Sequence, residues 1–164
     1  MGSARWCAKA LSMRNLHELN INEGGEAVRR SPPSDREFQD FQEKTRLILP
    51  LALKMLLRYS NGGHPELNTV DGENGQFSVD FFYHLTVDDD GPESIWYAVK
   101  HWRPILGEFA LPIAADGGGN QIYLDLAAGA GGVKICLHDE MRILELASTL
   151  ENFIDALAIN PEMI

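Results

Sequence analysis

Hydrophobic side chains recur at helical spacing in two neighbouring segments of the chain. The stretch SDRE places Glu37 three residues after Ser34, which is a capping box at a helix start. Pro50 suits the first turn of a second helix. The apolar stripe of this second helix consists of Leu53, Leu56 and Leu57. We expect Asn61–Gly63 to end it, because Asn and Gly accept the left-handed conformation of a C-terminal cap.

A clean alternation of apolar and polar residues marks FSVDFFYHL, residues 77–85. It predicts one strand with Phe77, Val79, Phe81, Tyr83 and Leu85 on one face. His84 falls on the opposite, polar face and is expected to be exposed. After the DDDG turn, Pro92 can start a helix over PESIWYAVKHW. The apolar side of this helix carries Ile95, Val99 and Trp102, with Trp96 and Tyr97 expected in the core or at its rim.

Three further alternating runs and a last helix complete the pattern. The runs cover Leu111–Ala115, Ile122–Leu126 and Val133–Leu137, and a second Ser-x-x-Glu box opens the helix at Ser148. Short loops between successive strands favour antiparallel pairing. The order therefore predicts an α+β fold rather than a doubly wound parallel sheet.

This pattern divides the chain into an arm and one domain. Residues 1–33 have weak periodicity, so we expect a tail or loosely attached arm there, followed by a domain over residues 34–160. Met1-Gly2-Ser3 resembles residues left by cloning, with Met13 as an alternative natural start.

The three consecutive glycines Gly117, Gly118 and Gly119 raise the question of a phosphate site. A dinucleotide fingerprint needs G-x-G-x-x-G between a strand and a helix. Here a strand pattern follows the glycines, and the chain contains no Gly-Lys-Ser or Gly-Lys-Thr. The run therefore predicts a hairpin turn in which at least one glycine has a positive φ. A second glycine-rich loop is predicted at Gly129–Gly132.

Composition and charge limit the classes of molecule that this chain is expected to bind. The chain has 164 residues, 45% of them hydrophobic, and suits one domain with its own core. A net charge of −10 disfavours nucleic acid as a partner. A basic protein fits this charge better, unless the charge serves solubility alone. No apolar run is as long as a membrane span and no secretory core is evident, so a cytoplasmic location is expected.

Candidate chemistry is sparse. The two cysteines fit no metal spacing, and Cys136 is expected in the core. Asp88–Asp90 predict a solvated turn rather than a cation site, because adjacent acids point in different directions. DGENGQ from Asp71 departs from a calcium loop at its sixth and twelfth positions. His138-Asp139-Glu140 can supply an acid–base pair, but a turn capping the last helix is favoured. We therefore predict no catalytic, metal or cofactor site.

Three stretches in order, LP…LLRYSNGGHP, LPIAADGGGNQIYLDL and KICLHDE, together resemble the SUKH superfamily, the Smi/Knr-like cell-wall-regulator family. Leu49-Pro50, Pro112-Ile113 and His138-Asp139 are among the matching positions. Asn120 and Cys136-Leu137 depart from it, where members often carry an acid and aromatics. The resemblance covers residues 34–157 and implies a mixed, largely antiparallel sheet beside helices. It also implies binding rather than catalysis, since bacterial members commonly serve as immunity proteins that neutralise toxins.

Three functions follow, in order of preference. The first is an immunity protein that binds a toxin, with a basic nuclease as one candidate. It acts as a monomer or weak homodimer without nucleic acid, membrane or cofactor. The second is a housekeeping interaction scaffold like the fungal relatives, and the third is a small hydrolase using His138 and Asp139. For the first, we expect the partner to meet a cluster of exposed acids in one turn and helix start: Asp88, Asp89, Asp90 and Glu93.

Overall fold

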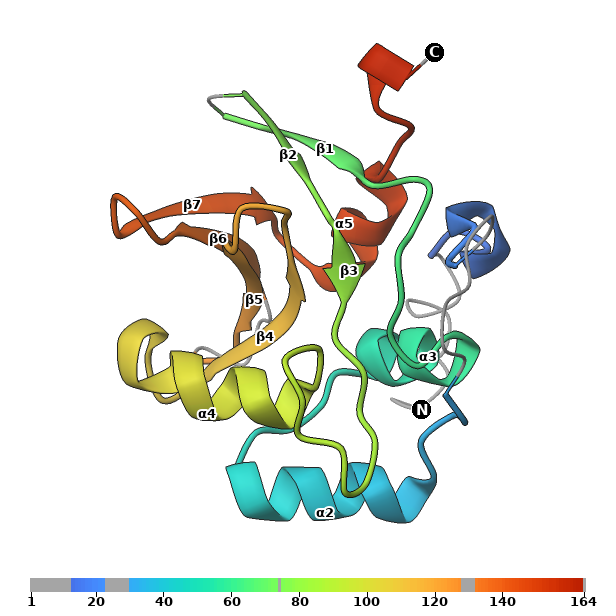
Figure 1. The fold of residues 1–164 in the computed structure, drawn as a ribbon, viewed down its shortest axis with the longest axis vertical. Coiled ribbons are helices and arrows are strands. Elements are labelled where there is room, and N and C mark those ends of the chain that lie inside the picture. The colour runs from blue at the N-terminus through green and yellow to red at the C-terminus, as the bar shows by residue number, and fades with distance from the viewer. Residues whose placement is uncertain (1–12, 23–29, 74, 128–131, 164) are drawn as a thin grey trace, which may run out of the picture.

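The computed structural model describes residues 13–22, 30–73, 75–127 and 132–163, and it builds them into helices and two sheets (Figure 1). The α-helices are α2 (Asp35–Thr45), α3 (Leu51–Tyr59), α4 (Ile95–Leu106) and α5 (Leu150–Ala156). Short 3-10 helices cover Leu16–Leu19 and Pro161–Met163.

The larger sheet has the order β3-β4-β5-β6-β7, so each strand lies beside its neighbour in sequence. Its strands are β3 (Phe81–Phe82), β4 (Ala110–Ala115), β5 (Gln121–Asp125), β6 (Gly132–Leu137) and β7 (Arg142–Ala147). A separate hairpin consists of β1 (Thr69–Gly72) and β2 (Gly75–Ser78). All these pairs are antiparallel. The predicted α+β class is confirmed.

Two clusters of buried side chains pack against the larger sheet, and helix α4 contributes to both. On one face, Ala110, Tyr123 and Cys136 form a small cluster with Leu106 of α4. On the other face, strand residues such as Leu111 and Ile122 join the main core with side chains of α2, α3 and α5. Both faces of β4 are buried along its whole length. In β4, the alternation therefore shows which buried cluster each side chain joins, and it does not separate a buried face from a solvent-exposed face.

Two helix predictions hold with small shifts. The Ser34 hydroxyl accepts a hydrogen bond from the Glu37 N–H, and the Glu37 carboxylate accepts one from the Ser34 N–H, so the capping box is confirmed. The helix predicted from Pro92 begins at Ile95 instead, because Ser94 is the residue whose hydroxyl accepts from the Trp96 N–H.

The end of α3 differs from the prediction. Ser60 is the C-cap and is extended, whereas Gly62 and Gly63 have φ of 82° and 120°. The φ angle of Asn61 is not in the left-handed region. Its buried side-chain amide donates to Leu85 O, and its oxygen accepts from Leu85 N–H, both within 2.9 Å. It therefore ties the end of α3 to the segment that follows β3.

The single strand predicted over residues 77–85 is wrong. The chain pairs with β1 as far as Ser78 and then changes sheet, since the Val79 N–H donates to Asn68 and the Asp80 N–H donates to Ala115. Past β3, the chain leaves the sheet and runs beside the start of α4. His84, expected on a polar face, is only 1% exposed because Glu93 and Ile95 bond to its backbone on that side.

The region before the last helix also differs. His138–Glu140 form the turn between β6 and β7, not a cap of α5, and the strand β7 was not predicted. The N-cap of α5 is Thr149, whose hydroxyl accepts from the Asn152 N–H. The predicted loop at Gly129–Gly132 lies outside the described residues except for Gly132, which begins β6.

Part of the predicted arm packs against the domain. In residues 13–22, Leu16, Leu19 and Ile21 belong to the main core, and Leu19 has no exposed surface. The Arg14 guanidinium donates to the backbone carbonyls of Ile154 and Leu157 near the end of α5. This segment is therefore attached by both apolar and polar contacts, in contrast to the loose attachment that its weak periodicity predicts.

Candidate functional site

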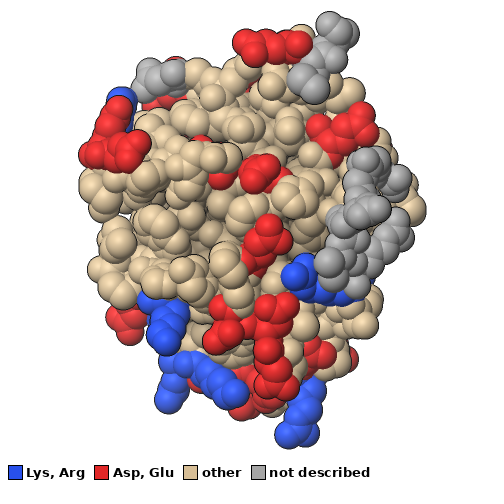
Figure 2. Space-filling model, viewed as in Figure 1, with Lys and Arg blue, Asp and Glu red and all other residues tan. Residues whose placement is uncertain are grey.

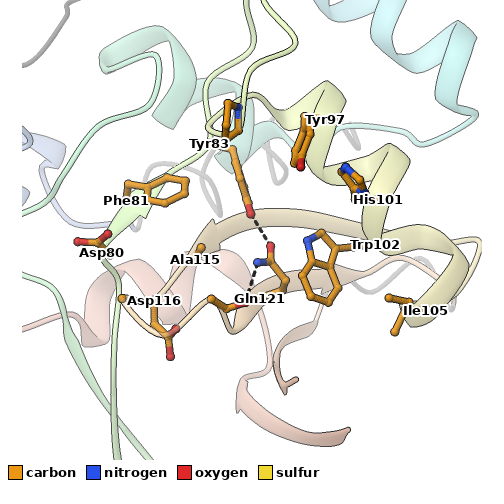
Figure 3. A pocket seen from close by; sticks show the side chains of 13 residues that line it. Asp80, Phe81, Tyr83, Tyr97, His101, Trp102, Ile105, Ala115, Asp116 and Gln121 are labelled. Atoms are coloured by element: carbon orange, nitrogen blue, oxygen red, sulfur yellow. Dashed lines mark hydrogen bonds between the residues drawn. The ribbon is translucent and has the colours of Figure 1, made fainter. Parts of the chain in front are cut away.

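A groove of about 510 Å³ lies between α4, the start of β3 and the β4–β5 turn (Figure 3). Its lining combines aromatic and acidic side chains with the glycines of the turn: Asp80, Phe81, Tyr83, Pro92, Tyr97, His101, Trp102, Ile105, Ala115, Asp116, Gly117, Gly119 and Gln121. Three segments far apart in sequence therefore meet at this one hollow.

Helix α4 supplies one wall. Tyr97, His101 and Ile105 recur every four residues and line the groove, whereas Ile95 and Val99 are buried in the core. Tyr97 is 36% exposed and Ile105 51% exposed, which is high for large apolar side chains. The Tyr97 and His101 rings meet edge to face at 4.1 Å. The helix thus presents a partly exposed stripe in addition to its core-facing stripe.

Two hydrogen bonds connect the residues at the floor of the groove. The Tyr83 hydroxyl donates to Gln121 Oε1 at 2.5 Å, and Gln121 Nε2 donates to the Gly119 carbonyl at 3.1 Å (Figure 3). Burial raises the pKa of Tyr83 to about 12, so its phenol stays protonated at neutral pH. The Phe81 ring meets Tyr83 edge to face at 5.2 Å. Tyr83 therefore shapes the floor of the groove, and its protonated phenol does not act as a general base at neutral pH.

The three glycines occupy the turn between β4 and β5, and Gly119 has a φ of 86°. Asp116 Oδ1 accepts from the backbone N–H groups of Gly118 and Asn120 at 2.9 and 2.8 Å. Its other oxygen accepts from the Asn120 amide at 2.7 Å. Because Asp116 already takes the N–H groups of this turn, they do not form a phosphate cradle.

Asn120, one of the two departures from the family pattern, has a defined role in this turn. Its side-chain oxygen accepts from the His138 N–H at 3.0 Å, and its amide nitrogen donates to Asp116. An acid in this position would lack the donor for Asp116. The amide therefore connects the β4–β5 turn to the β6–β7 turn.

The predicted acidic cluster splits into two kinds of residue. Asp88, Asp90 and Glu93 are exposed, and the cluster adjoins the groove at Pro92. Asp89 is only partly exposed and accepts from the Gly91 N–H at 3.2 Å, which holds the pKa of Asp89 below its ordinary value. Its other oxygen lies 3.6 Å from both His84 Nε2 and Arg30 Nε. Asp89 therefore stabilises the loop in addition to adding charge.

His84 is a titratable residue whose setting the sequence did not predict. Its Nδ1 lies 3.0 Å from the Thr86 hydroxyl and its Nε2 faces Asp89. Burial, together with the positive charge of Arg30, lowers the pKa of His84 despite the opposing effect of Asp89 and Glu93. The aromatic alternation around it gave no signal of this burial, which depends on the tertiary contact with α4.

Acidic side chains run down the middle of the face shown in Figure 2, from the region of β3 downward, and the basic ones lie toward its lower edge and margins. None of the residues that line the groove is Lys or Arg. The surroundings of the groove therefore favour a positively charged partner surface.

His138 and Asp139 do lie together, with Nδ1 and Oδ1 3.2 Å apart. The other ring nitrogen, Nε2, lies 2.8 Å from the Gly118 carbonyl. Nδ1 thus faces Asp139 within the β6–β7 turn, and Nε2 connects this turn to the β4–β5 turn. In the ranges that the structure describes, no group of three His, Cys, Asp or Glu side chains has the arrangement of a metal site.

Comparison with known families places the chain beside one described family. The model of the SMI1 / KNR4 family (SUKH-1) matches residues 32–156, which include the groove and the acidic turn. Comparison with curated proteins gives no match. Among the described residues, no helix has the length and apolar character to cross a membrane.

Proposed function

Because the chain belongs to the SMI1 / KNR4 family (SUKH-1), we propose that it is a protein-binding module that acts as an immunity protein and neutralises a toxin. The observation that carries this proposal is the groove, in which partly exposed aromatic side chains lie beside two acidic residues and no Lys or Arg is among the lining residues. A basic toxin, such as a nuclease that must bind phosphate itself, fits this surface best.

The construction of the groove suits recognition of a protein surface. Aromatic side chains such as Tyr97 and Trp102 contribute large contact areas and are enriched among residues that dominate binding energy. A hydrogen bond already joins Tyr83 to Gln121 at the floor of the groove, so these side chains lose little conformational entropy when a partner docks. The exposed acids at residues 88, 90 and 93 would speed the encounter with a basic partner.

The proposal predicts that a toxin gene lies beside the gene of this chain, and a direct test uses the purified chain and the toxic domain that this neighbouring gene encodes. We expect a one-to-one complex in gel filtration and loss of toxin activity at equimolar amounts. The matched control is the toxic domain from an unrelated locus, which should stay active. Many weak partners and no inhibition would instead indicate the housekeeping scaffold, and would contradict the proposal.

A further inference from the structure

The carboxylates that line the groove do not face its interior. Figure 3 shows the side chains of Asp80 and Asp116 at the edge of the groove, turned away from the aromatic rings. The polar atoms of the floor already bond to one another, because the Tyr83 hydroxyl donates to Gln121 and Gln121 donates to the Gly119 carbonyl. Among the described residues, no buried side-chain nitrogen or oxygen lacks a hydrogen-bond partner. The interior therefore presents no unpaired buried polar group to a ligand.

Aromatic rings form the walls of the groove. Tyr97, His101 and Trp102 project from α4, and Phe81 and Tyr83 come from the segment of β3 (Figure 3). Tyr97 and His101 are exposed and Trp102 is half-buried, so this wall keeps open ring surface. Both walls already contain an edge-to-face pair, with ring centroids 4.1 Å apart on α4 and 5.2 Å apart at β3. A further ring in the groove can add contacts of this kind, which an aliphatic side chain lacks.

The side of the groove formed by the β4–β5 turn is open. Gly117 and Gly119 line the groove without side chains, and a Cβ on Gly117 would meet no atom within 4 Å. The hollow measures about 510 Å³, which lies within the range of pockets that hold small ligands. A side chain that projects from a partner protein can therefore enter past the glycines without displacing a side chain of the turn.

From these observations we propose that the groove binds an uncharged aromatic side chain, such as phenylalanine or tryptophan, that projects from the surface of the partner protein. The inference rests on the proposed protein-binding function and names the group that anchors the partner. A basic surface around that side chain matches the acidic turn, which adjoins the groove at Pro92. The ring makes the specific contact in the groove, while the acids at residues 88, 90 and 93 act at longer range.

The test uses three small probes and needs no knowledge of the partner. The amides of N-acetyl-phenylalanine, N-acetyl-leucine and N-acetyl-arginine are titrated separately into the isotope-labelled full chain, and the indole N–H signals of Trp102 and Trp96 are followed by NMR. We expect a saturable Trp102 shift with the phenylalanine probe in the millimolar range. Leucine, which gains similar free energy on burial, should bind about two- to ten-fold more weakly because it lacks a ring. Arginine should give no saturable shift, and Trp96, which packs on Phe41, should not respond to any probe.

Two tyrosine variants locate the effect. Tyr97→Ala removes part of the aromatic wall, so it should weaken binding of the phenylalanine probe about three-fold or more and remove most of its advantage over leucine. Tyr59→Ala removes a tyrosine of α3 that does not line the groove, and it should leave both the affinity and the advantage unchanged. Tyr97 is 36% and Tyr59 39% exposed, so both variants should fold, as their amide spectra would verify.

Three results would overturn the inference: no saturable Trp102 shift with phenylalanine, binding of leucine or arginine as tight as that of phenylalanine, or an advantage of phenylalanine that survives Tyr97→Ala. These outcomes are separate from a failure of toxin neutralisation, since the probes report on the groove alone and the toxin assay reports on the whole complex. A chain that binds the phenylalanine probe but does not inhibit the toxin would contradict the proposed function and support the assignment of the groove.

Discussion

Gly119 is the residue of the β4–β5 turn whose φ, 86°, lies in the left-handed region. A β-branched side chain there is strained, so Gly119→Val should lower the free energy of unfolding by about 1 kcal/mol or more. Gly117→Ala is the matched control, because a Cβ at that position meets nothing within 4 Å. Urea unfolding of both variants measures the difference, and an equal loss in the two would contradict this explanation.

We expect the stability of the protein to depend on pH through His84. Its pKa is lowered in the folded protein, so between its folded value and about 6.5 the unfolded chain binds more protons. The free energy of unfolding should therefore fall as pH drops from about 7 toward 5, and the contribution is complete above the unfolded pKa. Arg30, Asp89 and Glu93 also face this ring, and burial is the largest cause of the shift.

His84→Gln removes the titrating group and should flatten this slope, even if it lowers stability at every pH. His101→Gln, at an exposed residue of α4, is the control and should keep the slope. Denaturant unfolding at a series of pH values gives the comparison. An unchanged slope in His84→Gln would assign the pH dependence to another group.

At the scale of elements, two adjacent hydroxyls at the start of α5 have different roles, and only one of them caps the helix. The Thr149 hydroxyl accepts from the Asn152 N–H at 3.1 Å, whereas Ser148 accepts from the Asn152 side chain only. Thr149→Ala should therefore cost about 1 kcal/mol of stability, and Ser148→Ala clearly less. Thermal or urea unfolding separates them, and the reverse order would support the Ser148 capping box that the sequence suggests.

Local patterns predicted the elements whose signals are local. The capping box at Ser34, the apolar stripe of α3 and the hairpin around Gly119 each depend on a few adjacent residues. The alternation over residues 77–85 failed because one strand pattern belongs to two sheets. The change of sheet depends on distant partners, since Val79 bonds to Asn68, 11 residues away, and Asp80 bonds to Ala115, 35 residues away. Long-range pairing of this kind leaves no periodicity of its own.

The candidate site was predicted less well than the fold, for the same reason. The acidic turn is contiguous in sequence, so the exposure of Asp88, Asp90 and Glu93 could be predicted, although the structural role of Asp89 was not. The groove joins α4, β3 and the β4–β5 turn, so its members are scattered along the chain. Tyr97 was expected in the core or at its rim, and only the position of α4 beside the turn shows what its exposed side faces.

At the scale of the whole molecule, the excess of acids should act on the rate of association. Replacing Asp88, Asp90 and Glu93 by their amides should slow association with a basic partner several-fold at low salt, with little effect at high salt. Asp89 is left unchanged because it holds the loop. Stopped-flow or surface-plasmon measurements give the rates, and an unchanged rate would assign these acids to solubility.

Protection of living cells tests the central claim, that this chain is an immunity protein, most directly. The measurement is growth of cells that produce the toxic domain encoded beside the gene, with and without this chain produced at the same time. The account predicts that the chain restores growth, and that the Tyr97→Ala variant, produced at the same level, restores it less well. Growth arrest that persists although the folded chain is present in excess would contradict the account.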